Sequence, residues 1–364
     1  MRQPSPEVLE RLVADCRTLA AKAAARIGGR VHLMEVCGTH SHAIARAGIR
    51  GLLGSDVRLV SGPGCPVCVT AAGQIDLCVS LALRPDTILA TFGDMVRVPG
   101  SEGSLAEARA RGGSVKVVYS PMEVLSVAQQ EPDRHVVMAG VGFETTAPAT
   151  ACMVREAGRL GLGNVSLLSA HKLVPPALSA LLAADDVGLH GFICPGHVSV
   201  VIGSNAYQPI VDEHHVACVV AGFEPAEILL AVRMLLQQVA DGEAKVGNAY
   251  RRAVTPEGNR HAVEAMYSVF EVGEASWRGI GTIPESGLVL RDEWSAFDAL
   301  RRFDLVAPEG KDHPACHCGE VLRGVRLPVE CPAFGKACTP ARPLGPCMVS
   351  SEGACAAEYR YRAA

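Results

Sequence analysis

The sequence predicts an α/β protein with two related small parallel-sheet domains and a third domain that is helical and cysteine-rich. Three observations predict this fold class. Short apolar runs alternate with polar turns and helical patterns between residues 31 and 222, longer helical patterns follow residue 224, and six of the fourteen cysteines fall within the last forty-nine residues. Alternating strand and helix patterns are typical of parallel sheets covered by helices.

The strand candidates are short runs rich in β-branched residues, each followed by a polar turn. They span residues 31–36, 57–60, 87–91, 115–119, 136–140, 165–169, 191–194 and 216–221. Eight strands suggest two small sheets. We expect the chain to divide near Ser120 and Pro121, so that residues 31–120 form the first α/β domain and residues 121–222 the second.

The longest helical patterns lie outside this region. Residues 1–25 carry charges spread through an amphipathic pattern, which predicts a helix and not a signal peptide. Residues 225–240 and 256–272 predict two further helices. We assign residues 1–30 and 223–364 to the third domain.

Composition and charge exclude several classes of partner. The 364 residues are 49% hydrophobic and 20% charged, with a net charge of -4, so no basic surface for nucleic acid is expected. The longest stretch without a charged residue, 191–211, is interrupted by prolines and polar residues and does not predict a membrane span. We therefore expect a cytoplasmic protein whose cysteines serve metal or redox chemistry.

The first loop with potentially reactive residues reads Cys37-Gly38-Thr39-His40 and follows the strand at 31–36. A cysteine at a helix N-terminus beside an imidazole has its thiolate favoured by the helix dipole and by the nearby hydrogen-bonding group. Such a thiolate is a nucleophile or a soft metal ligand. The alternative is an inert buried cysteine with Thr39 as the helix cap, since free cysteine is among the most buried residue types.

The second loop runs from Gly62 to Cys68 and reads GPGCPVC. Two cysteines separated by two residues either form a reversible disulfide or supply half of a tetrahedral metal site. The sequence holds no second pair of this spacing to complete a zinc site. We therefore favour a redox role for Cys65 and Cys68.

Acid and imidazole groups follow three strands of the second half. Glu144, His171 and His197 come after the strands at 136–140, 165–169 and 191–194. Ligands of open α/β sheets bind at the carboxyl ends of strands, so these groups could shuttle protons in one pocket. Taken singly, each is a local hydrogen-bonding residue. We expect the functional loops of both halves to face one cleft.

The late cysteines give the most specific chemical signal. Cys316, Cys331, Cys338 and Cys355 are separated by fourteen, six and sixteen residues. Zinc ribbons and fingers use close pairs, whereas iron-sulfur clusters tolerate wide, loop-borne spacing. We predict a four-iron, four-sulfur (4Fe-4S) cluster on these four cysteines, with a zinc-stapled tail as the alternative. Two more cysteines of the tail could replace one of the ligands: Cys318 and Cys347.

These motifs together resemble the HypD family of hydrogenase maturation proteins. The matching segments are, in order, CGTH at 37–40, GPGCPVC at 62–68, GFETT at 142–146, PGHV at 195–198, and a tail from CP at 331–332 to GPCMVS at 345–350. The resemblance implies two α/β domains plus a cluster-bearing domain. It also implies assembly of an iron carrying two cyanides and one carbon monoxide, the unit inserted into nickel-iron hydrogenases.

The resemblance also assigns roles and partners. It implies that Cys37 holds the iron, that Cys65 and Cys68 are a redox-active pair, and that the four late cysteines bind the 4Fe-4S cluster. The implied partners are a HypC-like chaperone, a HypE-like cyanide donor and, through the chaperone, the hydrogenase large subunit. Four side chains are candidates for proton supply or for hydrogen bonds to bound cyanide: Thr39, His40, Glu144 and His197.

Two other functions stay open at this stage. The first is an iron-sulfur-dependent thiol-disulfide reductase, in which Cys65 and Cys68 reduce an external disulfide and Cys37 has no necessary role. The second is a non-redox scaffold with a zinc-stapled tail. Metal content and infrared spectra separate all three functions.

Overall fold

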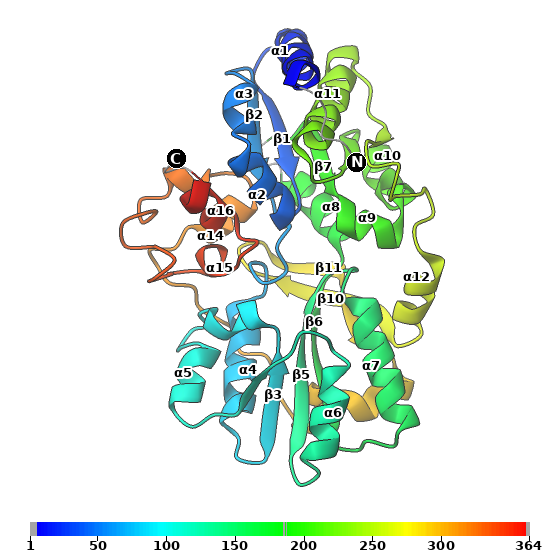
Figure 1. The fold of residues 1–364 in the computed structure, drawn as a ribbon, viewed down its shortest axis with the longest axis vertical. Coiled ribbons are helices and arrows are strands. Elements are labelled where there is room, and N and C mark those ends of the chain that lie inside the picture. Colours follow the sequence, from blue (N-terminus) through cyan, green and yellow to red (C-terminus); the bar gives the residue numbers. More distant parts are fainter. Residues whose placement is uncertain (1–5, 185, 187, 362–364) are drawn as a thin grey trace.

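The computed structural model describes residues 6–184, 186 and 188–361. They form two lobes stacked along the long axis of the molecule, and the chain passes between the lobes more than once (Figure 1). Each lobe contains one parallel sheet covered by helices on both faces, as the alternating pattern predicts.

The first lobe is built on a five-stranded parallel sheet with the strand order β2-β1-β7-β8-β9. Its strands are β1 (Val31–Glu35), β2 (Val57–Ser61), β7 (Gly191–Pro195), β8 (Ala217–Ala221) and β9 (Val246–Asn248). One face packs against α1 (Pro6–Ile27), α2 (Gly38–Arg46), α3 (Ile49–Leu52) and α11 (Pro225–Asp241). The other face packs against α8 (Val174–Ala184), α9 (Gly196–Ile202), α10 (Gln208–His214) and the cysteine-rich tail.

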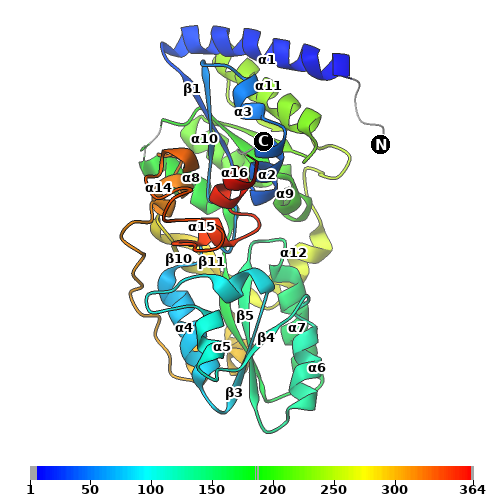
Figure 2. The same cartoon turned by 60° about the vertical axis from the view of Figure 1, so that its left-hand side comes forward.

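The second lobe contains a four-stranded parallel sheet with the order β4-β3-β5-β6 (Figure 2). Its strands are β3 (Thr87–Thr91), β4 (Val115–Val117), β5 (His135–Gly142) and β6 (Val165–His171). Helices α4 (Ala72–Leu83) and α5 (Leu105–Ala110) cover one face. Helices α6 (Glu123–Gln130) and α7 (Ala147–Arg159) cover the other, where α12 (Arg260–Tyr267) also packs.

The sheets do not follow the division expected near Ser120 and Pro121. All eight predicted strands form, but β3 and β4 pair with β5 and β6, whereas β1 and β2 belong to the sheet of β7 and β8. The expectation that residues 31–120 and 121–222 each form a sheet is therefore wrong. Local patterns predict strands but do not specify which distant strand becomes a neighbour. The strands of the second sheet are inserted between β2 and β7 of the first, and α12 joins the second lobe later in the chain.

The region after residue 223 also differs from the single helical domain that the sequence predicts. Both α1 and α11 form as predicted, but they pack on each other and on the first sheet. The helix expected at 256–272 ends at Tyr267. From Phe270 the chain forms an antiparallel hairpin of β10 (Phe270–Trp277) and β11 (Gly281–Leu290). Pairing with β11 outweighs the helical spacing of the apolar residues before β10.

The hairpin and the cysteine-rich tail lie where the two lobes meet. Strand β11 contacts β6 of the second lobe and α8 of the first. An extended loop over residues 304–317 leads from the second lobe up to the tail (Figure 2). Four short helices follow the hairpin along the chain: α13 (Ala299–Arg302), α14 (Cys318–Leu322), α15 (Pro346–Val349) and α16 (Ala354–Tyr361). Elsewhere and between these helices, 3-10 turns lie at Gly93–Arg97, Ser204–Tyr207, Asp292–Phe297 and Pro328–Glu330.

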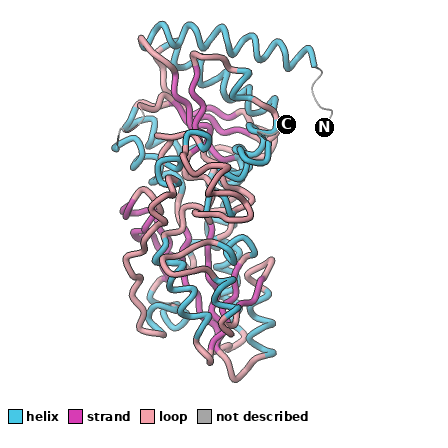
Figure 3. Tube along the Cα trace, turned by 90° about the vertical axis from the view of Figure 1, so that its left-hand side faces the viewer, coloured by secondary structure: helices cyan, strands magenta, loops and turns pink. Residues whose placement is uncertain are grey.

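Loops and not regular elements dominate the junction between the lobes (Figure 3). Because parallel strands present their carboxyl ends at one edge, loops that follow the strands of both sheets meet there. Within the described residues, no helix combines the length and apolar composition that crossing a membrane requires.

Candidate functional site

Cys37 follows β1 and is the N-cap residue of α2, as the sequence predicts. The backbone N–H groups of Thr39 and His40 point at its sulfur and favour the thiolate, but burial raises the pKa of the Cys37 thiol to about 12. Desolvation thus opposes the thiolate that the helix N-terminus favours. A soft metal cation bound at the sulfur would instead make the Cys37 thiolate the favoured form.

Two carboxyl groups flank Cys37, of which Glu35 is buried and Glu352 half-buried. Glu35 Oε2 accepts a hydrogen bond from the Cys37 N–H at 3.0 Å, and Oε1 accepts one from the Ser41 hydroxyl at 2.5 Å. Burial raises the pKa of Glu35 to about 7. On the other side, Glu352 packs against Gly38, and its pKa is raised by burial and by Asp94. The Cys37 sulfur thus lies between two acids that hold protons more tightly than usual.

The loop bearing Cys65 and Cys68 packs directly on the Cys37 loop. The Gly38 N–H donates to the Gly64 carbonyl at 3.1 Å. Cys65 and Cys68 are buried and joined as a disulfide with their Cα atoms 5.2 Å apart. This loop carries the chain from β2 in the first lobe to α4 in the second, so the cysteine pair sits at a crossing between lobes.

Glycine at position 64 allows this close approach. A Cβ atom at Gly64 would overlap the backbone of Val36 and Cys37. We expect Gly64→Ala to lower the free energy of unfolding by about 2 kcal/mol, since the two loops must separate. Thermal unfolding of both proteins measures the change. The matched control is Gly51→Ala, where an added Cβ meets nothing within 4 Å; equal stability losses in the two variants would contradict the close packing.

Two imidazoles meet at the ring of Phe223. The ring of His197, at the start of α9, stacks on Phe223 with centroids 4.0 Å apart, and the ring of His40 lies 5.0 Å from the same centroid. His40 Nε2 is 2.9 Å from the Gly222 carbonyl, so Nε2 carries the proton. Burial lowers the pKa of His40 to about 4, which leaves Nδ1 as a buried, neutral acceptor. The structure therefore brings together His40 and His197, as predicted.

Glu144 and His171 have hydrogen-bond partners of their own. Glu144 Oε1 accepts the Val174 N–H at 2.9 Å, while Oε2 is buried without a partner among the described residues, and burial raises the pKa of Glu144 to about 7. His171 bonds to Thr150 and Ser169 inside the second lobe. The proton shuttle expected between Glu144, His171 and His197 is therefore wrong for His171, which is a core residue.

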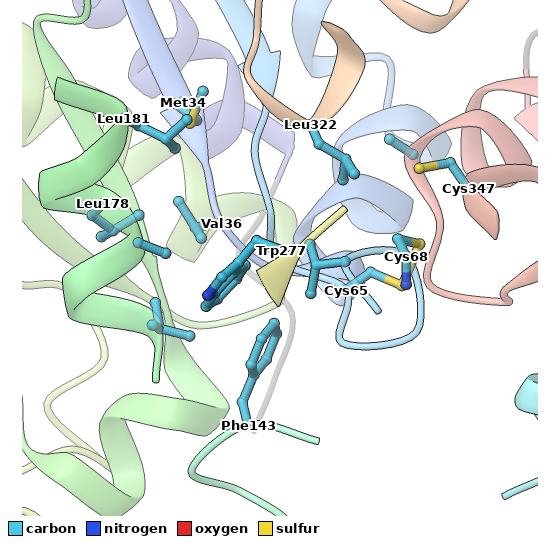
Figure 4. Packing of buried hydrophobic residues seen from close by; sticks show 14 of the residues in the cluster. Met34, Val36, Cys65, Cys68, Phe143, Leu178, Leu181, Trp277, Leu322 and Cys347 are labelled. Carbon is cyan, nitrogen blue, oxygen red and sulfur yellow. A yellow bond between two sulfur atoms is a disulfide. The ribbon is translucent and has the colours of Figure 1, made fainter. Parts of the chain in front are cut away.

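The residues around Glu144 connect it to the hairpin instead. The ring of the adjacent Phe143 stacks on Trp277 with centroids 6.0 Å apart. Lys172 is buried, donates to Gln74 at 3.2 Å and lies over the Trp277 ring. Burial lowers the pKa of Lys172 to about 7. In the view of Figure 4, the Cys65 and Cys68 pair lies between Trp277 and Cys347 of the tail, all within one hydrophobic cluster.

All six late cysteines line one hollow, together with His317 and apolar side chains such as Val321, Phe334 and Met348. The six are Cys316, Cys318, Cys331, Cys338, Cys347 and Cys355. Burial and the neighbouring thiols raise the pKa of the Cys355 thiol well above its usual range. The structure thus brings the four predicted ligands together and places both additional candidates with them.

The donor set of this hollow fits an iron-sulfur cluster. Its lining supplies soft sulfur atoms, which iron-sulfur clusters require, beside apolar side chains and the His317 imidazole. Within the described part of the chain, no three His, Cys, Asp or Glu side chains are grouped closely enough to hold a single metal ion.

Comparison with known proteins identifies the family. A family model for HypD, described as the hydrogenase formation hypA family, matches residues 10–362. This chain belongs to the HypD family. The hydrogenase maturation factor HypD of Azotobacter vinelandii is 49% identical over 357 residues, which cover 96% of this chain and 94% of the relative. HypD of Escherichia coli K12 is 45% identical over 359 residues, covering 98% and 96%. The resemblance inferred from the motifs is thereby confirmed.

Several buried charged residues of this HypD chain escaped the sequence reasoning. Glu35, Lys172 and Arg278 are all buried, with at most 3% of the surface of each residue exposed. For Glu35, the signal is an acidic residue at the end of a mostly apolar strand, two residues before Cys37. Glu352 reaches Thr39 from the far end of the chain, and no local pattern predicts that contact.

Proposed function

We propose that this chain is the scaffold and redox protein on which the iron, cyanide and carbon monoxide unit of nickel-iron hydrogenases is assembled. The observation that carries the proposal is the packing of the Cys37 loop on the loop of Cys65 and Cys68. A thiol suited to iron is thereby held next to a pair of thiols suited to two-electron chemistry. The cysteine hollow lies in the same hydrophobic cluster as that pair.

Cys37 is the proposed ligand of the iron that is being assembled, which is a substrate of this protein. A thiolate is a soft donor and suits an iron that also carries cyanide and carbon monoxide. Iron binding displaces the thiol proton, which the raised pKa otherwise retains. In this proposal a cysteine of a HypC-like chaperone supplies a second thiolate, and the chaperone later carries the unit to the hydrogenase large subunit.

Cys65 and Cys68 are proposed to provide the electrons that release cyanide. A HypE-like donor presents cyanide as a protein thiocyanate, with carbon bonded to sulfur. The two thiols lose two protons and two electrons and form their S–S bond. The sulfur-carbon bond breaks, the donor sulfur takes one proton as a thiol, and cyanide leaves with the other as hydrogen cyanide, so atoms and electrons balance.

The 4Fe-4S cluster would be held by Cys316, Cys331, Cys338 and Cys355, with Cys318 and Cys347 as alternative ligands. When bound, such a cluster supplies single electrons that restore the dithiol. The remaining proposed roles belong to groups that hold protons near Cys37 or at the junction of the lobes. His40 Nδ1 accepts a hydrogen bond, Thr39 donates one, and Glu144 and His197 are the proposed proton carriers.

Anaerobic purification followed by metal analysis and infrared spectroscopy tests the whole proposal. The full chain with its chaperone is expected to contain iron, labile sulfide, and cyanide and carbonyl stretches. Iron and sulfide without those stretches, together with reduction of an external disulfide, would instead support the thiol-disulfide reductase. Zinc alone would support a non-redox scaffold.

We predict that Cys65 and Cys68 interconvert between dithiol and disulfide, because their two-residue spacing in a Gly- and Pro-rich loop before a helix favours one activated thiolate. Alkylation after oxidation and after reduction, followed by mass spectrometry, should show a two-proton difference on the peptide that contains both residues. Cys152 is exposed and unpaired, so it reports that the reagent works in both samples. Full alkylation of Cys65 and Cys68 after oxidation would remove the redox role.

A further inference from the structure

Arg278 is a buried cation that the proposed chemistry does not use. It lies at the tip of the β10–β11 hairpin, and 3% of its side chain is exposed. Its Nε is 2.6 Å from Asp312 Oδ1, and Nη2 donates to the Pro99 carbonyl at 2.8 Å. Nη1 is buried with no hydrogen-bond partner among the described residues. Such a donor is unfavourable unless an acceptor or a negative charge compensates it.

The hairpin tip connects the two sulfur-containing regions. The Arg278 N–H donates to the carbonyl of Val69, which follows Cys68, at 2.9 Å. The next residue, Gly279, lies so close to Gly319 that a Cβ on either glycine would overlap the other backbone. Gly319 follows Cys318 of the hollow. Arg278 therefore lies between the redox pair and the hollow, attached to both by backbone contacts.

The charge of Arg278 lies near the hollow, because the neighbouring Gly279 packs against Gly319. The guanidinium is within electrostatic range of Cys318 and Cys347, as its partner Asp312 is of Cys316. Its partner Asp312 has a side chain that is 39% exposed, so water screens part of that negative charge. The guanidinium itself has almost no water around it, and its field reaches the sulfur atoms with little screening.

We propose that Arg278 is a positioning residue that raises the reduction potential of the iron-sulfur cluster in the cysteine hollow, through its buried charge and its free Nη1 donor. This inference rests on the proposed function, because it requires that cluster. One-electron reduction makes a cluster with its thiolates more negative. A fixed cation, and hydrogen bonds to sulfur, stabilise the reduced form over the oxidised form.

A redox titration of three variants tests this role. Arg278→Gln keeps a hydrogen-bonding side chain but removes the charge. It should make reduction about tenfold less favourable, which lowers the midpoint potential by about 59 mV for a one-electron couple. Asp312→Asn leaves the guanidinium uncompensated and should shift the potential upward. Arg278→Lys retains the charge and should restore most of the wild-type value.

The titration uses full-length protein loaded anaerobically, with dithionite as the reductant and the spectrum of the reduced cluster as the readout. Iron and sulfide contents are matched before the potentials are compared. Equal potentials for wild type and Arg278→Gln would overturn the inference, as would shifts of the same sign for Arg278→Gln and Asp312→Asn. If Arg278→Gln does not fold, the upward shift in Asp312→Asn decides. A wild-type chain that binds no cluster would overturn the proposed function as well.

Discussion

Replacing Cys37 by alanine is expected to abolish hydrogenase maturation while leaving the iron-sulfur absorbance intact. The substitution deletes the proposed soft donor to the assembling iron but removes no thiol of the cysteine hollow. In infrared spectra of anaerobic protein purified with the proposed HypC-like chaperone, the cyanide and carbonyl stretches should fall below detection. Maturation in cells that lack their own HypD should fall with them.

The matched control is Cys16→Ala. Cys16 is also fully buried, but it lies in α1 against α11, on the far side of the first sheet from the hollow. Both variants lose one buried thiol, so a difference between them measures chemistry and not packing. Cyanide and carbonyl stretches that persist in Cys37→Ala would rule out Cys37 as the iron ligand, whatever the stability of the variant.

Replacing Cys331 or Cys338 by serine is expected to remove the brown absorbance and the labile sulfide of the purified protein. Serine is nearly the same size as cysteine but offers a hard oxygen in place of a soft thiolate. Loss of one of four ligands should reduce cluster content to a small fraction of the wild-type value. Iron and sulfide analysis of anaerobically isolated protein gives the measurement.

Cys152→Ser provides the control for this second experiment, because Cys152 is exposed on α7 and far from the tail in sequence. Its cluster content should equal that of wild type. The same substitution at Cys318 and at Cys347 identifies which thiols of the hollow are ligands. Retention of both colour and sulfide in Cys331→Ser and Cys338→Ser would remove the assignment of the tail as a cluster site.

Local patterns predicted the elements of this fold but not their assembly. Each of the eight strand candidates forms. Short β-branched runs between turns are typical of strands that are buried on both faces of a sheet. The pairing of β1 with β7 joins segments about 160 residues apart, and no local signal encodes it. The hairpin was missed because Met266 and Phe270 fit a helical spacing, although β10 carries the second of them.

The candidate site was predictable where the residues of a motif lie together in one short segment of the chain. Cys65 and Cys68 lie in one loop, and Cys37 lies at the turn between a strand and a helix, so short segments were sufficient to identify them. The energetic balance at Cys37 was not predictable, because desolvation depends on Glu35, Glu352 and the surrounding fold. Arg278 was missed for a similar reason, since its neighbours come from three distant segments.

The insertion of one lobe into the other fixes the order in which the protein is completed during translation. All strands of the second sheet lie between residues 87 and 171, so that sheet can close while β7, β8 and β9 are still being synthesised. The first sheet must wait for residue 248, and the thiols of the hollow emerge last. Domains fold as units from the N-terminus during synthesis. A nascent chain therefore offers metal ions no assembled set of six thiols until both sheets have had time to form.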